Sequence, residues 1–481
     1  MRFYSICTIW ATIVVATATD SNSDTTFIFN GDGCEQNHLF QTRYRPQIQQ
    51  LASDVQRIID HVMSVNESGR TYRQLAEFVD RFGSRLTGTK NLEDSIDYMI
   101  DLLRQEGHDN VHGESVQVPR WTRGNEWARM IKPREKKLNI LGLGYSEGTN
   151  GQTIEAPIVV VRNFTELEQK SRLIPGKIVV YNFHYESYGK QAIYRHSGAS
   201  RAAEFGAVAA MIRSLTPFSI DSPHTGMQTY DVNVTRIPAI SITAEDADLF
   251  QRFSDRNEEV IVQIYSENRN EKEQGISRNT VSDIRGEQYP DEIVLVSGHI
   301  DSWDVGQGAL DDGAGSFISW RALSVIKQLG LRPKRTMRSI LWTGEEFGLI
   351  GVFDYVKKHQ NELKNYVLAM ESDIGTFTPK GITFSGRNST SQCTLWEILQ
   401  LMHPINATTL TISTEGSDVQ AFYENGVPIS SLDTANDKYF YFHHTQGDTM
   451  TVEQSDDLDK CQALWTSVSY ALAMLDDRLP R

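Results

Sequence analysis

The chain has 481 residues, of which 39% are hydrophobic, so it can bury more than one core and is expected to be globular. Its formal net charge of -15, from 47 basic and 62 acidic residues, argues against nucleic acid or an anionic membrane surface as a partner. A length of this order predicts roughly two or three domains.

The first residues, 1–18, are typical of a secretory signal. Arg2 precedes an apolar stretch that ends near Ala16, and the small residues up to Ala18 predict cleavage after that position. The stretch is too short to span a bilayer, and no later segment is a better candidate, so we expect no membrane span. We predict secretion, with the lysosome or another secretory lumen as a further destination. Five N-x-[ST] sequons fit this route: Asn66, Asn163, Asn233, Asn388 and Asn406.

Three cysteines remain once Cys7 leaves with the signal, namely Cys34, Cys393 and Cys461. So few cysteines do not form a disulfide scaffold, and a large core must hold the fold. We expect one pair at most, Cys393 with Cys461, since both lie in the C-terminal part. The sequence alone leaves the connectivity open.

Residues 19–50 form a polar tract without sustained periodicity, which we interpret as a removable propeptide or a loose arm. Residues 51–145 are interpreted as the first part of a larger domain. Within them Ile96, Met99, Ile100 and Leu103 have the spacing of an amphipathic helix, and the segments 112–121 and 136–145 are expected to be strands.

Residues 146–266 differ in texture, with short apolar runs set among Gly, Asn and Ser turns. The runs predict five strands, and the segments 199–207 and 244–253 predict helices. This pattern favours a compact, β-rich inserted module, in which we find no convincing cluster of metal ligands.

Residues 267–481 return to strands that alternate with helices. Strands are expected at 293–296, 338–344, 365–373 and 427–433, and helices at 311–329 and 457–475. This alternation predicts an α/β fold, with a mixed central sheet and helices on both faces. Ligands of such sheets bind at the carboxyl ends of the strands.

Ionisable residues gather at those predicted strand ends. Each alone fits a core histidine, a helix cap or a turn, but together two histidines and three carboxylates suit two zinc-like ions that share a bridging carboxylate. Asp301, two residues after His299, is expected to accept the other imidazole proton and fix the tautomer. One glutamate of the pair at 345 and 346 is then free as general base for a metal-bound water. The residues are His299, Asp301, Asp311, Asp312, Glu345, Glu346, Asp373 and His444.

Four motifs, "SGHIDSWDVGQGALDDGAGS", "WTGEEFGLIG", "MESD" and "FHHTQGDTM", resemble in order the signature of the M28 family of co-catalytic zinc peptidases. The resemblance implies a zinc aminopeptidase/phosphorylase-like fold, a protease-associated domain at 146–266, a zymogen and a homodimer. It implies Glu345 as general base and, as ligands of two Zn²⁺ per chain, His299, Asp311, Glu346, Asp373 and His444. Asp312 competes with Asp311 for the bridging position, and His443 competes with His444.

The expected function is that of a secreted di-zinc metallopeptidase acting on small peptides, with unblocked dipeptides as the favoured substrates. An aminopeptidase acting on longer peptides is the alternative within the family. A non-catalytic receptor of the same architecture is disfavoured by the complete ligand set. A glutaminyl cyclase is disfavoured by the ligand set and the insertion together.

Overall fold

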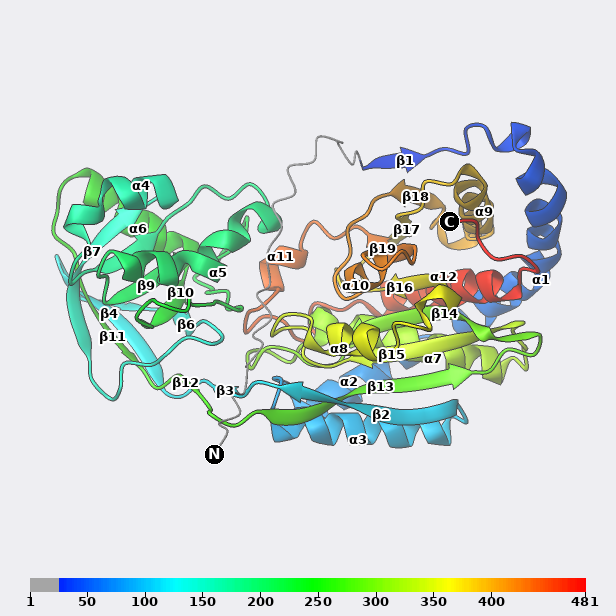
Figure 1. Ribbon diagram of the computed structural model, residues 1–481, viewed down its shortest axis with the longest axis horizontal. Coiled ribbons are helices and arrows are strands. Elements are labelled where there is room, and N and C mark those ends of the chain that lie inside the picture. The colour runs from blue at the N-terminus through cyan, green and yellow to red at the C-terminus, as the bar shows by residue number, and fades with distance from the viewer. Residues whose placement is uncertain (1–25) are drawn as a thin grey trace, which may run out of the picture.

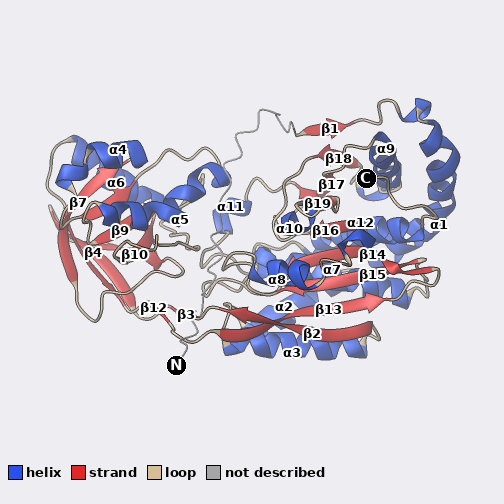
Figure 2. Ribbon diagram, viewed as in Figure 1, coloured by secondary structure: helices blue, strands red, loops and turns tan. Residues whose placement is uncertain are grey.

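The computed structural model describes residues 26–481, so the expected signal at 1–18 and the start of the polar tract lie outside the described residues. Figure 1 shows two lobes side by side, a larger domain and the inserted domain, and Figure 2 shows strands at the centre of each. The larger domain combines strands with helices, as the α/β prediction requires, and the inserted domain, predicted to be β-rich, has an eight-stranded sheet with helices beside it.

A nine-stranded sheet in the order β1-β18-β17-β19-β16-β14-β15-β13-β2 forms the centre of the larger domain. β14 runs parallel to its neighbours β15 and β16, and β16 runs parallel to β19. The sheet is mixed, because β13 pairs antiparallel with β15 and β2. Its strands are β1 (Phe27–Phe29), β2 (Asp109–Val118), β13 (Gly275–Ile284), β14 (Tyr289–His299), β15 (Arg335–Trp342), β16 (Tyr366–Glu371), β17 (Pro379–Phe384), β18 (Thr409–Ile412) and β19 (Ile429–Thr434).

Helices cover both faces of this sheet. Val294 and Val296 of β14 join a core with one set of helices, whereas Ile293 and Leu295 join a core on the opposite face, as the two-residue period of a strand requires. The first face packs against α1 (Arg45–Val62), α2 (Arg70–Phe82), α3 (Lys90–Gln105), α7 (Ala314–Gln328), α9 (Ser389–Gln400) and α12 (Ser455–Met474). The second packs against α8 (Ile350–Lys358) and α10 (Gln420–Tyr423).

The remaining helices of the larger domain are short. α11 (Tyr439–Phe442) lies between the two lobes in Figure 1. The others are η1 (Cys34–Gln36), η2 (Phe40–Tyr44), η4 (Ala309–Gly313), η5 (Leu363–Asn365) and η6 (His403–Ile405).

The inserted domain has an eight-stranded sheet in the order β5-β4-β11-β7-β8-β9-β10-β6. The run from β7 to β10 is parallel, and Val180, Met211 and Ile240 lie in its core. Its elements are β4 (Glu126–Lys132), β5 (Lys136–Leu138), β6 (Ile140–Gly142), β7 (Ile154–Val161), α4 (Phe164–Gln169), η3 (Ser171–Leu173), β8 (Ile178–Tyr181), α5 (Tyr188–Glu204), β9 (Ala209–Arg213), β10 (Ala239–Ile242), α6 (Ala244–Asp255) and β11 (Ile261–Ser266).

The inserted domain begins earlier than the sequence predicted. β4, β5 and β6 belong to its sheet, so the segment 136–145 does not belong to the larger domain. Two short strands, β3 (Trp121–Thr122) and β12 (Arg269–Asn270), pair antiparallel where the chain enters and leaves this domain. The predicted end at 266 coincides with the end of β11.

Within 26–50, the prediction of a loose polar arm is wrong. β1 pairs antiparallel with β18 at the edge of the large sheet, and η2 leads directly into α1. The predicted cysteine pairing is also wrong, because Cys34 forms the disulfide with Cys393, whereas Cys461 is free and buried. The disulfide fastens this N-terminal segment to α9.

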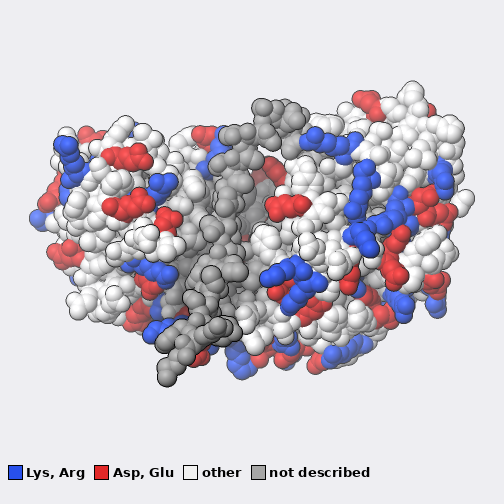
Figure 3. Space-filling model, viewed as in Figure 1, with Lys and Arg blue, Asp and Glu red and all other residues white. Residues whose placement is uncertain are grey.

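Over the described residues, no helix combines the length and apolarity needed to cross a bilayer. Figure 3 shows acidic and basic side chains scattered over both lobes on the face drawn.

Candidate metal centre

Three neighbouring parallel strands bring the predicted residues together. His299 is the last residue of β14, Glu345 and Glu346 follow β15, and Asp373 follows β16. Because β14 pairs in parallel with both neighbours, these carboxyl ends meet at one edge of the sheet. Asp311 comes from η4, just before α7, and His444 from the loop after α11.

Asp311 lies at the centre of the cluster. Its Oδ1 is 3.1 Å from Nε2 of His299, and its Oδ2 is 3.3 Å from Nε2 of His444. Asp373 Oδ1 lies 3.3 Å from the same nitrogen of His299, and Glu346 Oε2 lies 3.0 Å from that of His444. One carboxylate therefore joins two groups of ligand atoms.

Backbone carbonyls hold both histidines in the same tautomer. Nδ1 of His299 donates to the carbonyl of Asp301 at 2.9 Å, and Nδ1 of His444 donates to the carbonyl of Thr225 at 3.1 Å. Each Nε2 is thereby left as an electron-pair donor toward the cluster, as metal-ligating histidines require. The backbone of His444 has a φ of 62°, in the left-handed region that a non-glycine residue seldom adopts.

The expected contact of the Asp301 side chain differs from the observed one. Its Oδ1 lies 3.7 Å from Nδ1 of His299, beyond a hydrogen bond, and the imidazole proton goes to the Asp301 carbonyl instead. The carboxylate accepts the backbone amides of Glu345 at 3.2 Å and Glu346 at 3.3 Å, and the Thr87 hydroxyl at 2.6 Å. Asp301 thus positions the turn that carries the two glutamates.

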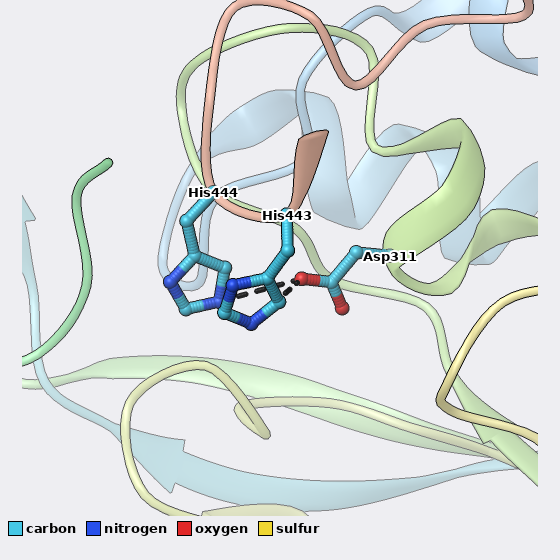
Figure 4. Close-up of side chains that lie close together, drawn as sticks. All are labelled: Asp311, His443 and His444. Carbon is cyan, nitrogen blue, oxygen red and sulfur yellow. Dashed lines mark ion pairs between the residues drawn. The ribbon is translucent and has the colours of Figure 1, made fainter. Parts of the chain in front are cut away.

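Asp312 and His443, which compete with Asp311 and His444 for the ligand positions, have different surroundings. Asp312 accepts the backbone amides of His299 and Gly315, so its carboxylate is used within the fold. The ring of His443 stacks on that of His444 with centroids 3.5 Å apart, and its Nε2 lies 3.6 Å from Asp311 Oδ2 (Figure 4). His443 is farther from that oxygen than His444 and packs among the rings of Tyr188, Tyr439 and Phe440.

Glu345 and Glu346 face different ways. The side chain of Glu346 is 3% exposed and contacts His444, whereas that of Glu345 is 18% exposed and lies 4.0 Å from His299. Glu345 Oε1 also accepts the hydroxyl of Ser417 at 2.9 Å. Both glutamates line a cavity of about 390 Å³ together with Asp311, Asp373 and His444.

The electrostatics of the cluster favour positive charge between the acids. Burial opposes protonation of the histidines, yet Asp373 and Asp311 raise the pKa of His299, and Glu346 and Asp311 raise that of His444. Burial raises the pKa of Glu346 to about 7 and that of Glu345 well above its usual value. The raised pKa values of these four side chains show that the cluster favours positive charge, which protons or bound metal cations can supply.

The donor set fits divalent zinc, which takes imidazole nitrogens and carboxylate oxygens. Two buried oxygens, Asp311 Oδ2 and Glu346 Oε1, have no hydrogen-bond partner among the described residues. Buried carboxylate oxygens without a partner are costly unless a cation binds them. His299, Asp311 and Asp373 form one group of adjacent ligand atoms, and Asp311, His443 and His444 form a second.

The inserted domain contributes side chains that the sequence analysis missed. Arg195 and Tyr188 of α5 line the same cavity, and Nδ1 of His224 donates to the His443 carbonyl at 2.7 Å. No local pattern in the inserted domain marks these residues, since only the packing of the two domains brings them to the cluster. Burial raises the pKa of Glu371, at the end of β16, to about 8, and this side chain accepts the backbone amide of Val419.

The chain is similar in sequence to known peptidases. Residues 279–469 match the family model described as Peptidase family M28. Carboxypeptidase Q of Xenopus laevis is 48% identical over 424 residues, which covers 88% of this chain and 90% of that protein. Human carboxypeptidase Q is 46% identical over 424 residues, covering 88% of this chain and 89% of that protein.

Solved structures show the same fold. The peptidase M28 precursor from Shewanella amazonensis is 30% identical and superposes with a TM-score of 0.85, covering 90% of this chain and 99% of that one. A zinc aminopeptidase from Bacillus subtilis, at 19% identity and a TM-score of 0.64, shares the fold. The chain therefore belongs to peptidase family M28, a family of zinc-dependent exopeptidases.

Proposed function

We propose that this chain is a di-zinc exopeptidase that hydrolyses small peptides, with unblocked dipeptides as its main substrates. The position of Asp311 between two ligand groups, beside the partly exposed Glu345, is the observation that carries the proposal. The ligands we assign to two Zn²⁺ are His299, Asp311, Glu346, Asp373 and His444.

Zinc in such a site supplies Lewis-acid polarisation of the peptide carbonyl and lowers the pKa of water. We assign the proton transfers to Glu345, whose carboxylate faces the cavity. Glu345 takes a proton from the attacking water and delivers it to the leaving amine. Ser417 orients this carboxylate through its hydroxyl, and Asp301 holds the backbone amide.

The substrate class rests on two supports. The relatives with 46–48% identity bear the name carboxypeptidase, an enzyme that releases residues from a free carboxyl end. The cavity of about 390 Å³ is at the small end of the range of roughly 300–1,000 Å³ that holds small ligands. The name of the relatives favours cleavage at a free carboxyl end over trimming from the amino end, and the size of the cavity favours short peptides.

The test is a panel of unblocked dipeptides, N-blocked dipeptides and longer peptides, each assayed with and without a chelator. We expect cleavage of unblocked dipeptides, loss of activity with the chelator, and about two zinc ions per chain by elemental analysis. Preferred trimming of long peptides would support the aminopeptidase alternative. Absence of both zinc and cleavage would support the receptor.

We also infer export, glycosylation and a homodimer. The disulfide between Cys34 and Cys393 fits an oxidising compartment. Asn66, Asn163, Asn233 and Asn406 are exposed, whereas Asn388 is half-buried at the start of α9. A glycosidase-dependent mass shift of protein from the culture medium tests the first two inferences, and sedimentation tests the dimer, which a monomer at micromolar concentration would refute.

A further inference from the structure

A buried carboxylate outside the assigned ligand set contacts the segment that carries Asp311. Asp448, four residues after His444, is 4% exposed and accepts three consecutive backbone amides. Its Oδ1 accepts the amides of Ala309 at 2.9 Å and Leu310 at 2.7 Å, and its Oδ2 accepts that of Asp311 at 3.3 Å. One side chain thus fixes the backbone of Asp311 and of the two residues before it.

These amides need an acceptor from elsewhere in the chain. Asp311 and Asp312 have non-helical dihedral angles, with φ of -123° and -126°, so the helical geometry is interrupted within η4, before α7 begins. The first amides of a helix have no acceptor inside it, and a buried amide without a partner is costly. Asp448 supplies the acceptor, although it lies 137 residues after Asp311 in the sequence.

Arg85 holds the carbonyl groups of the same segment. Its side chain is buried, and its terminal nitrogens donate to the carbonyls of Gln307 at 2.7 Å and Gly308 at 2.9 Å. Its Nε donates to the carbonyl of Ile300 at 2.7 Å, next to the assigned ligand His299. Arg85 therefore joins the end of β14 to the segment that precedes η4.

The turn between these two sets of contacts is tightly packed. Gly308 has a φ of 59°, and a Cβ there would come within 2.3 Å of the Ser302 Cβ and 3.0 Å of a terminal nitrogen of Arg85. The backbone amide of Gln307 donates to the Asp448 carbonyl at 2.6 Å. The opposite charges of Asp448 and Arg85 also attract each other. The turn is therefore held through both its amides and its carbonyls.

We propose that Asp448 and Arg85 are positioning residues that hold Asp311 at the bridge between the two metal positions, so that both positions depend on them. The Asp448 oxygens are occupied by amides, and a guanidinium carries only donors, so we assign neither residue as a ligand. An error in the placement of a shared carboxylate weakens both positions at once, whereas the loss of Glu346 weakens one. The inference rests on the proposed function and names the residues that shape its bridging ligand.

A general loss of stability has to be separated from a loss of positioning. Removal of the Asp448 carboxylate leaves buried amides without an acceptor, which lowers stability whatever the role of the residue. Asp459 provides the matched control, because it is 1% exposed and accepts the Gly69 amide at 2.7 Å and the Ser68 hydroxyl at 2.9 Å. It lies in α12, which carries none of the assigned ligands.

The experiment compares Asp448→Asn and Asp459→Asn with the wild type, each as the full mature chain. Competition with a chromophoric chelator measures the affinity for zinc at each position. We expect Asp448→Asn to lower the affinity at both positions about 10- to 100-fold, the usual size of a lost partner of a metal ligand, and Asp459→Asn to leave it unchanged. The visible spectrum of the Co²⁺-loaded protein, which reports ligand geometry, should change in Asp448→Asn alone.

Arg85→Lys tests the second residue. Lysine keeps the charge but lacks the rigid fork that reaches three carbonyls, so we expect it to lower the zinc affinity at both positions as well. Denaturant unfolding of the metal-free proteins measures the stability that each variant loses. Zinc affinities are compared under conditions in which these curves show every variant to be folded. Unchanged affinity in Arg85→Lys would overturn the proposal for Arg85.

Three results would overturn the proposal for Asp448: unchanged zinc affinity in Asp448→Asn, a loss confined to one position, and an equal loss in Asp459→Asn. A wild type that binds no zinc would overturn it as well. Assays of the same preparations on unblocked dipeptides test the enzyme separately. If two zinc ions bind in a manner that depends on Asp448 while no peptide is cleaved, the peptidase proposal fails and the positioning role stands.

Discussion

Adjacent residues in a turn point in different directions, and Glu345 and Glu346 use this difference. Glu346 contacts His444 and is almost fully buried, whereas Glu345 faces the cavity and accepts the Ser417 hydroxyl. Asp301 accepts both of their backbone amides, so the two side chains diverge from a turn that is held in place. This geometry assigns different chemistry to two identical residue types.

Glu345→Gln tests the assigned base. A neutral amide cannot take a proton from the attacking water, so we expect turnover to fall by about 10²- to 10⁴-fold. Zinc content should stay the same, because Glu345 is not among the assigned ligands. Elemental analysis and steady-state kinetics on one preparation measure both quantities.

Glu346→Gln is the matched comparison, one residue away. An amide oxygen is a poorer zinc ligand than a carboxylate, so this variant should lose metal from one position. If Glu345→Gln loses metal while Glu346→Gln only slows, the two roles are reversed. Unchanged turnover in both variants would remove the pair from catalysis.

At the scale of single residues, the sequence identified the candidate residues better than it predicted their contacts. Spacing and motif order were sufficient to bring His299, Asp311 and Asp373 together as candidates. The side chain of Asp301 was assigned to the wrong partner, because a residue two positions from a histidine can offer either its carboxylate or its carbonyl. Residue types alone do not decide between these acceptors.

Among the secondary-structure elements, those around the cluster were predictable because their patterns are local. Buried apolar runs predicted the strands β14, β15 and β16, and an amphipathic stripe predicted α3. The elements that the sequence did not predict correctly are short or pair with distant strands. β1 has three residues. β5 and β6 belong to the inserted domain only because they pair with β4 and β10. The start of α1 was missed, although Ile48, Leu51 and Val55 carry a helical spacing.

The cysteine pairing gives an element-scale prediction. The disulfide ties η1 to α9 across a separation of 359 residues, and Cys461 lies buried in α12. Burial raises the pKa of the Cys461 thiol well above its usual value, so the thiolate that reacts with labelling reagents is scarce. The native mature chain should show no reactive thiol.

Denaturation without a reductant should then expose one thiol, and a non-reducing digest should yield a peptide that joins Cys34 to Cys393. A digest that joins Cys393 to Cys461 would contradict the structure. Reduction of the native disulfide should cost about 2–5 kcal/mol of stability, most of it through the N-terminal segment.

Glu453, at the N-terminal end of α12, gives a prediction on pH. Burial raises the pKa of Glu453 to about 8. The Thr376 hydroxyl donates to this carboxyl group at 2.6 Å, which lowers the pKa and offsets part of the effect of burial. The folded chain therefore keeps this proton up to about pH 8, whereas an unfolded glutamate loses it near pH 4.5. The stability this group contributes is complete below pH 4.5 and is lost as the pH rises toward 8.

Glu453→Gln replaces the protonated acid by a neutral isostere, so its stability should match that of the wild type at about pH 4, below the unfolded pKa of 4.5. Toward pH 8 the variant should become more stable than the wild type, by about 1.4 kcal/mol for each pH unit in that window. Denaturant unfolding at a series of pH values measures the difference, and any effect of metal affinity that both proteins share cancels. A constant difference between pH 5 and pH 8 would argue against the raised pKa.

On the scale of the whole molecule, the candidate metal centre lies where the two domains meet. The backbone amide of Thr225 donates to the His444 carbonyl at 3.0 Å, and Nδ1 of His444 donates back to the Thr225 carbonyl at 3.1 Å. His224 adds a third hydrogen bond, to the His443 carbonyl at 2.7 Å. This junction could not be predicted from the sequence, because Thr225 and His444 lie far apart in the chain and no local period connects them.

Hydrogen exchange should therefore report zinc through the inserted domain. When a chelator removes the cation that His444 is assigned to hold, the loop at 443–446 loses one of its constraints, and its hydrogen bonds to the segment 222–229 open more often. We expect faster amide exchange in both segments, while the core strands β8 and β9 keep their rates. His444→Ala in the presence of zinc should produce the same local pattern, because it removes both the ligand and the bond to Thr225. Uniformly faster exchange throughout the inserted domain would point to general destabilisation, and unchanged exchange at 222–229 would show that the two domains are not coupled through this site.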